Sequence, residues 1–180
     1  MLQITIAAEE FWDEEKQEFV TPKGQTLKLE HSLVSISKWE SKWHKAFLGK
    51  QQKTLAETLD YIRCMTLTQN VDPSVYLRLK RDQIKEIKAY IDSPMSATVI
   101  SDPGKSRNNG ETITSELIYY WMTAFNIPIE CEKWHINRLL TLIRICSIKS
   151  QPPKKRSRQD ILRQNHELNQ ARKKKYHTRG

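Results

Sequence analysis

The segment that decides the fold class is Ile127–Lys149, with the sequence IPIECEKWHINRLLTLIRICSIK. Its apolar side chains recur at helical spacing, which gathers them on one face of a helix. The residues on that face are Ile136, Leu139, Leu140, Ile143 and Cys146. The preceding stretch, Glu116–Phe125, is apolar on nearly every side and predicts a helix buried all round, while Asn126 and Pro128 supply a stop and a turn. We therefore expect a helical hairpin that forms the core of a small domain.

Length and composition are typical of a globular protein. The 180 residues allow one domain with an extension, and 38% hydrophobic residues are enough for a core. No apolar run approaches the roughly 18 residues that a membrane-spanning helix needs. The N-terminal MLQITIAAEEFWDEE lacks the basic start of a secretory signal, and three widely spaced cysteines are typical of reduced thiols. We expect a cytoplasmic protein without a membrane segment.

The net charge of +9 is concentrated at the C-terminus. Residues 151–180 hold 10 of the 30 Lys and Arg residues and two acids, whereas residues 1–150 hold 20 basic and 19 acidic residues. A nearly neutral body with a basic tail indicates an appended contact segment and not a basic binding face. We expect three parts: an N-terminal β-hairpin subdomain packed on the body (1–30), a helical core domain (31–150) and a basic extension (151–180).

The N-terminal part has the alternation and the turns of a small antiparallel sheet. Residues 2–8 alternate and are rich in β-branched side chains, which predicts a strand. A polar run between residues 12 and 19 predicts a hairpin turn, and Thr26–Leu29 predicts a third short strand. The overall fold class that we expect is mainly α, with this small sheet at the N-terminus and a basic, polar helix or tail at the C-terminus.

From about His31 the period of the apolar residues becomes helical. Leu33, Ile36, Trp43 and Phe47 fit one stripe of a helix through LVSISKWESKWHKAFL, and Trp39 lies beside it. Tryptophans four residues apart share a face and bury a large area against a neighbour. Two interpretations stay open: core packing, or an aromatic patch that binds a partner through Trp39, Trp43 and Phe47.

The following segments carry helix start and stop signals. Thr54–Glu57 is a capping-box pattern, and the apolar residues that then run on one face of the helix are Leu55, Leu59, Ile62 and Met65. We expect Asp82 to cap a helix that ends at 92–94, and Thr112 to cap the helix that contains Glu116–Phe125. Between them, residues 97–100 have the composition of a brief strand.

The C-terminal segment has helix-forming composition but few apolar residues. After Pro152-Pro153 we expect a polar helix, or a partly disordered tail that becomes ordered on a partner. Its basic cluster is Arg172, Lys173, Lys174 and Lys175. Such a cluster is suited to an acidic protein surface or to a non-specific, salt-sensitive contact with nucleic acid.

No motif predicts catalysis, a metal site or a cofactor site. Gly104-Lys105-Ser106 resembles the end of a phosphate-binding loop, but Val99 stands where that motif needs a glycine. Cys131 and His135 have the spacing of a metal pair on a helix, but no second pair completes a four-ligand zinc site. The five histidines form no acid–base set in the sequence. We therefore expect a non-enzymatic protein without a cofactor.

Four stretches together resemble a known family of phage proteins. They are LEHSLVSISKWESKWHKAFL (Leu29–Leu48), ETLDYIRCMTL (Glu57–Leu67), ITSELIYYWMTAFNIPIECEKWHINRLLTLIRIC (Ile113–Cys146) and the closing basic segment. The most specific markers are SKWESKW and NIPIECEKWHINRLLTLIR. The chain is similar over most of its length to the tail assembly chaperones of tailed bacteriophages with long, non-contractile tails.

This resemblance implies a non-enzymatic role in the host cell cytoplasm. Such chaperones bind the tape-measure protein, a very long helical rod, and help the tail-tube subunits to assemble around it before leaving. The resemblance implies the tape-measure protein as partner, with the major tail-tube protein and self-association as further possibilities. The alternatives are a structural virion protein, such as a connector or minor tail component, and a nucleic-acid-binding protein that acts through its basic tail.

Overall fold

The computed structural model describes residues 1–8, 11–13, 17–20, 24–100, 112–151 and 158–176. Over these residues the chain is mainly helical with a small N-terminal antiparallel sheet, which confirms the predicted fold class. Its contacts divide it into two units, Met1–Ser147 and Ile148–Gly180. No described helix is both long enough and apolar enough to cross a lipid bilayer.

The N-terminal strands form two antiparallel pairs. β1 (Leu2–Ile6) pairs with β4 (Gln25–Leu29), and β2 (Phe11–Asp13) pairs with β3 (Glu18–Val20). Alternate residues of β1 and β4 are buried because successive side chains of a strand point to opposite faces of the sheet. They are Ile4, Ile6, Leu27 and Leu29. β4 confirms the predicted third strand, and β2 and β3 pair on either side of the predicted hairpin turn, of which residues 14–16 lie outside the described residues.

The first helix is shorter than the sequence predicts. α1 (Leu33–Trp43) begins at Ser32, whose side chain and that of Ser35 form a reciprocal capping box, and it ends at His44 with a left-handed φ of 51°. Phe47 therefore lies in the connection after α1 and not in the helix. The physical reason is tertiary, because Glu40 Oε1 accepts a hydrogen bond from Phe47 N at 2.7 Å and holds the chain in a turn.

The second helix has the predicted start but a different buried face. α2 (Leu55–Met65) begins at Thr54, which forms the predicted capping box with Glu57. Of the residues on the apolar face, Leu55 is 69% exposed. The buried side chains are Glu57, Tyr61, Ile62 and Met65. The buried face of α2 therefore follows its contacts with α1 and the sheet more closely than its apolar pattern.

The middle of the chain holds two helices. α3 (Ser74–Leu77) is a single turn, and α4 (Arg81–Asp92) ends before Pro94 as predicted. The start of α4 differs from the prediction, because Lys80 N donates to Gln83 Oε1 while Asp82 lies in the first turn. Residues 97–100 form no strand in the described structure.

The segment Ile127–Lys149 forms a 3-10 helix and an α-helix, and the helix that precedes it packs on α1. α5 (Ser115–Ala124) is capped by Thr114 and not by Thr112, and its Tyr120 is 66% exposed, so the expectation of burial all round is wrong. Asn126 has a φ of 52° and confirms the predicted stop. The 3-10 helix η1 (Ile129–Lys133) leads into α6 (Ile136–Ser150), whose buried residues are Ile136, Leu139 and Ile143.

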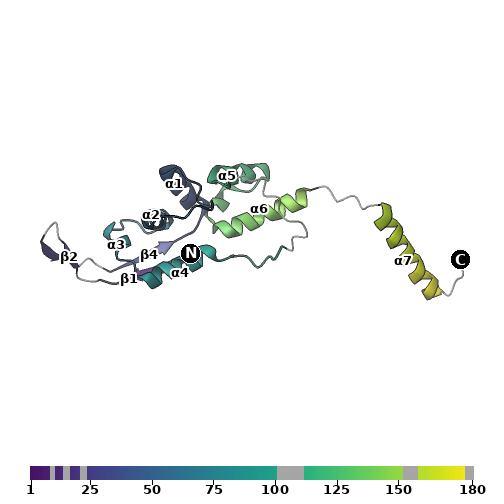
Figure 1. The fold of residues 1–180 in the computed structure, drawn as a ribbon, viewed down its shortest axis with the longest axis horizontal. Coiled ribbons are helices and arrows are strands. Elements are labelled where there is room, and N and C mark those ends of the chain that lie inside the picture. Colours follow the sequence, from purple (N-terminus) through teal and green to yellow (C-terminus); the bar gives the residue numbers. More distant parts are fainter. Residues whose placement is uncertain (9–10, 14–16, 21–23, 101–111, 152–157, 177–180) are drawn as a thin grey trace. The chain divides into compact units, whose positions relative to one another are not determined.

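Residues far apart in the sequence meet at the junction before α1 (Figure 1). His31 O accepts a hydrogen bond from Ile136 N at 2.7 Å, and Glu30 N donates to Met65 O at 2.9 Å. The end of β4 is thus tied to the start of α6 and to the end of α2. The largest fully buried side chains belong to one hydrophobic core and include Trp39, Leu33, Ile36, Ile62, Met65, Ile118, Ile136 and Leu139.

The second unit contains the helix α7 (Arg158–Tyr176). Its side chains are exposed wherever the structure describes them, including Leu162 and Leu168. Because its described side chains are exposed, α7 depends for stability on its internal hydrogen bonds and ion pairs, such as Arg163 with Glu167 at 3.3 Å.

Candidate functional site

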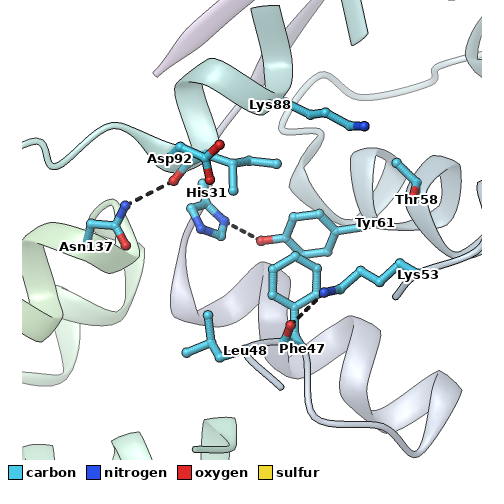
Figure 2. A pocket seen from close by; sticks show the side chains of 10 residues that line it. His31, Phe47, Leu48, Lys53, Thr58, Tyr61, Lys88, Asp92 and Asn137 are labelled. Atoms are coloured by element: carbon cyan, nitrogen blue, oxygen red, sulfur yellow. Dashed lines mark hydrogen bonds between the residues drawn. The ribbon is translucent and has the colours of Figure 1, made fainter. Parts of the chain in front are cut away.

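A pocket of about 410 Å³ lies in the first unit between the connection after α1 and the helices α2, α4 and α6 (Figure 2). Cavities of this size are typical of binding sites for small molecules or for single side chains of a partner. The lining residues are His31, Phe47, Leu48, Lys53, Thr58, Tyr61, Lys88, Ile91, Asp92 and Asn137. This pocket is the candidate functional site.

Its floor is a buried polar cluster. His31 Nδ1 and Tyr61 Oη are hydrogen-bonded, and the two residues are 2% exposed each. The ring of His135 stands edge-on to that of His31, with centroids 5.0 Å apart, and its Nε2 is hydrogen-bonded to Tyr90 O at 3.0 Å. Both histidines are therefore held in place by neighbours on other elements.

Burial sets the ionisation of this floor. Burial and, to a smaller extent, the neighbouring His135 lower the pKa of His31 from 6.5 to about 3. Burial also lowers the pKa of His135, although its hydrogen bond to the Tyr90 carbonyl acts in the opposite direction. Burial raises the pKa of Tyr61. At neutral pH these groups are uncharged, so the floor is polar but neutral.

We predict that the protein loses stability on acidification because of His31. Its pKa is 6.5 when unfolded and about 3 when folded, so below pH 6.5 the unfolded chain binds a proton that the folded chain excludes. The stabilisation is present above pH 6.5 and is lost as the pH falls. Between pH 7 and pH 5 we expect the free energy of unfolding to drop by about 2 kcal/mol. Urea unfolding at a series of pH values measures this drop.

The matched control is His166, an exposed histidine of α7. His31→Gln is expected to reduce the drop between pH 7 and pH 5 by about 2 kcal/mol and to leave the part that comes from His135, whose pKa burial also lowers. His166→Gln is expected to leave the drop unchanged. An unaltered pH profile in a folded His31→Gln variant would contradict the assignment.

One wall of the pocket is an aromatic pair with a lysine against it. The rings of Phe47 and Tyr61 are stacked with centroids 3.8 Å apart. Lys53 Nζ lies 4.3 Å from the centroid of the Phe47 ring and donates to Phe47 O at 2.7 Å. Burial lowers the pKa of Lys53, which the nearby Glu57 partly offsets. The wall is therefore apolar on its face and cationic at its edge.

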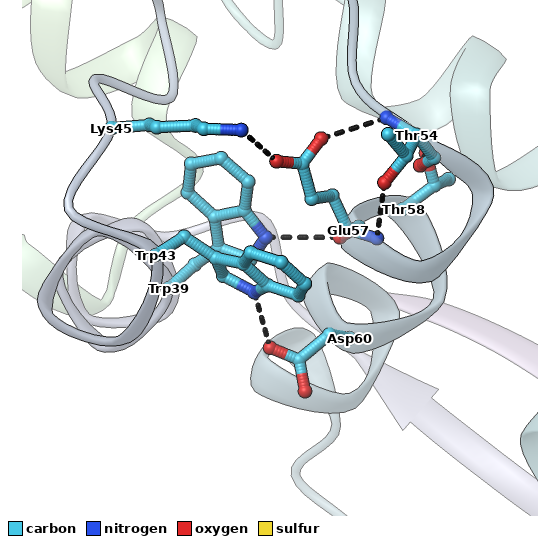
Figure 3. Close-up of polar contacts among 7 residues, drawn as sticks. All are labelled: Trp39, Trp43, Lys45, Thr54, Glu57, Thr58 and Asp60. Atoms are coloured by element: carbon cyan, nitrogen blue, oxygen red, sulfur yellow. Dashed lines mark hydrogen bonds and ion pairs between the residues drawn. The ribbon is translucent and has the colours of Figure 1, made fainter.

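The two tryptophans of α1 belong to a polar network that joins α1 to α2 (Figure 3). Trp39 Nε1 donates to Glu57 O at 2.9 Å, and Trp43 Nε1 donates to Asp60 Oδ2 at 2.8 Å. The carboxylate of Glu57 in turn accepts from Lys45 Nζ at 2.5 Å, and this hydrogen bond holds the pKa of Glu57 below its usual value. The network attaches the helices to each other and orients the connection that carries Phe47.

These positions decide between the two interpretations of the aromatic residues. Trp39 is 1% exposed and Phe47 is 7% exposed, while Trp43 is half-buried. The structure brings Trp39 close to both of the others, but as a packed cluster and not as an exposed patch. Core packing is therefore the better description of Trp39, and Phe47 contributes to a partner surface only through the pocket that it lines.

The basic cluster lies at the end of α7. Arg172, Lys173, Lys174 and Lys175 are all exposed, and Lys175 Nζ lies 5.6 Å from the centroid of the Tyr176 ring. Consecutive residues of a helix point in different directions. The four charges therefore surround the helix end and do not form one face.

Cys131 and His135, the residues with the spacing of a metal pair, are both buried. His135 uses Nε2 for Tyr90 O and accepts with Nδ1 from Asn137 N at 3.3 Å. Among the described residues no group of three or more His, Cys, Asp or Glu side chains is placed to hold a metal ion. Gly104-Lys105-Ser106 lies outside the described residues.

Several residues of the site carry no recognisable pattern in the sequence. Lys53 and Lys88 are two of 30 basic residues, and only the packing of the connection and α4 brings them to one pocket. Glu40 also carries no pattern in the sequence, because its partners lie outside its own helix. Its two carboxylate oxygens accept from Phe47 N and from Ser115 N at 2.7 Å each. It joins α1, the connection and the start of α5.

Comparisons with protein-family models, with curated proteins and with solved structures found no match to this chain.

Proposed function

We propose that this chain is a tail assembly chaperone of a bacteriophage with a long, non-contractile tail. In this role it is non-enzymatic, acts in the host cell cytoplasm and binds the tape-measure protein. The observation that carries the proposal is the resemblance of SKWESKW (Ser37–Trp43) and NIPIECEKWHINRLLTLIR (Asn126–Arg144) to that family. The mainly helical fold is compatible with it.

The physical requirements of the role support the proposal. A long helical rod exposes apolar helix faces before the tail tube covers them, and a chaperone needs a concave, partly apolar surface to shield such faces reversibly. The first unit offers a pocket whose walls include Phe47, Leu48 and Ile91. The second unit adds an exposed basic helix that is suited to acidic surfaces of the same rod.

The solubility of the tape-measure protein tests the proposal. Expressed alone, the tape-measure protein of the phage that encodes this chain is expected to aggregate through its exposed apolar faces. Co-expression with this chain is expected to raise its soluble fraction severalfold and to allow both proteins to be purified together. Co-expression of a protein of similar size and net charge is the control. An equal soluble fraction with the chain and with the control would contradict the proposal.

A structural virion protein is the alternative function, and it predicts a different fate for the chain. A connector or minor tail component remains in the finished particle, whereas a chaperone leaves before the tail is complete. The presence of the chain in purified particles therefore separates the two functions.

A further inference from the structure

The pocket of the first unit has largely apolar walls and basic residues at its edge. Phe47, Tyr61 and Ile91 line it with apolar surface, while Lys53 and Lys88 stand at its rim. Figure 2 shows Lys88 on α4 and Lys53 on the connection after α1, with the Lys53 ammonium group turned toward the Phe47 carbonyl. An occupant that fits both features has an apolar side chain for the interior and a negative charge for the rim.

The walls are held by hydrogen bonds that do not involve any occupant. Phe47 N donates to Glu40, and the Phe47 ring is stacked on Tyr61. On the opposite side, Asn137 Nδ2 donates to Ile91 O at 3.0 Å and to Ser93 O at 2.8 Å, which fixes the end of α4. A preformed pocket binds without the entropic cost of ordering its own walls.

The charges around the pocket favour an anionic partner. Lys53 and Lys88 are the basic residues that line the pocket, and Asp92 is the only acid that lines it in the part of the chain that the structure describes. The ammonium group of Lys53 already donates to Phe47 O, so the partner's carboxylate is expected at Lys88. His31 is neutral at the floor because burial lowers its pKa to about 3. Lys88 is exposed on α4, so a partner can reach its ammonium group without displacing any side chain of the core.

We infer that the pocket binds an acidic amphipathic helix of the tape-measure protein, which inserts one apolar side chain and pairs a carboxylate with Lys88. This inference rests on the proposed function and adds to it the binding surface and the chemistry of the bound segment. Residues three or four apart on a helix are neighbours on its surface, at about 5–6 Å. An apolar anchor and an acidic residue one turn away therefore reach the interior and the rim together.

Two variants and one control test the inference in the co-expression experiment. Lys88→Glu reverses the charge at the rim, and Thr58→Trp fills the pocket from α2, where Thr58 is half-buried. Lys38→Glu makes the same change of charge on the exposed side of α1, away from the pocket. The tagged chain is used to capture the tape-measure protein, and the captured amount per chain is measured at fixed ionic strength. Thermal unfolding of each variant confirms that it is folded.

We expect Lys88→Glu to lower the captured amount about tenfold and Thr58→Trp about a hundredfold, whereas Lys38→Glu changes it less than about twofold. If the wild-type chain captures the tape-measure protein and both pocket variants capture it equally well, the inference is overturned and the proposed function stands. If the wild-type chain captures nothing, the proposed function fails, and the inference fails with it.

Discussion

Replacing Glu40 by alanine is expected to lower the free energy of unfolding by about 4 kcal/mol, because two buried backbone N–H groups then lack an acceptor. The carboxylate of Glu40 accepts from Phe47 N through one oxygen and from Ser115 N through the other, at 2.7 Å each. Glu40 is 7% exposed and Ser115 is 1% exposed, so the two N–H groups lie away from bulk water. Urea unfolding followed by circular dichroism measures the change.

Two further variants at acidic positions make this prediction specific. In Glu40→Gln one oxygen remains as an acceptor while the new amide N–H₂ faces a donor, so we expect about half of the effect of alanine. Glu86 is exposed on α4, and Glu86→Ala is expected to change the free energy of unfolding by less than about 0.5 kcal/mol. A Glu40→Ala protein as stable as Glu86→Ala would show that Glu40 does not hold α1 and α5 together.

Replacing Trp39 by alanine is expected to cost about 4 kcal/mol, and the same change at Trp43 about 1–2 kcal/mol. Trp39 is 1% exposed, its Nε1 donates to Glu57 O, and its ring packs edge-on against Phe47 with centroids 5.3 Å apart. Trp43 is half-buried and shares its partner Asp60 with Lys42. Its loss therefore removes less buried area and leaves Asp60 with a charged partner.

The test is which of the two substitutions, Trp39→Ala or Trp43→Ala, lowers the free energy of unfolding more. Equal losses of stability, or a larger loss for Trp43→Ala, would contradict the burial of Trp39. This order also bears on function, because a Trp39→Ala protein that fails to bind a partner would report on folding and not on a binding surface. The partner surface is better examined through Lys88, which is exposed.

Local signals in the sequence were sufficient for much of the fold. The alternation of residues 2–8, the capping box of Thr54 with Glu57, and the stop at Asn126 each depend on residues close together in the chain, and all are present. The predicted end of α1 was wrong because the observed end depends on Glu40, whose carboxylate accepts hydrogen bonds from Phe47 and Ser115. Tertiary contacts of this kind leave no periodic pattern.

The candidate site was less predictable for a related reason. The spacing of Trp39 and Trp43 shows that they share a face, but spacing alone does not show whether that face meets a core or a partner. The structure buries Trp39 against α2 and leaves the pocket beside Phe47. Lys53 and Lys88 come together only through the packing of α4 against the sheet and the connection, so neither stands out in the sequence.

The fate of the chain during tail assembly tests the central claim most directly. Material containing the tape-measure protein can be isolated from infected cells during assembly and compared with purified particles, and quantitative mass spectrometry then gives the molar ratio of this chain to the tape-measure protein in each. A tail assembly chaperone predicts a substantial ratio in the assembling material and the absence of the chain from the particles. A ratio that is the same in both would identify a structural component, and absence from both would contradict binding to the tape-measure protein.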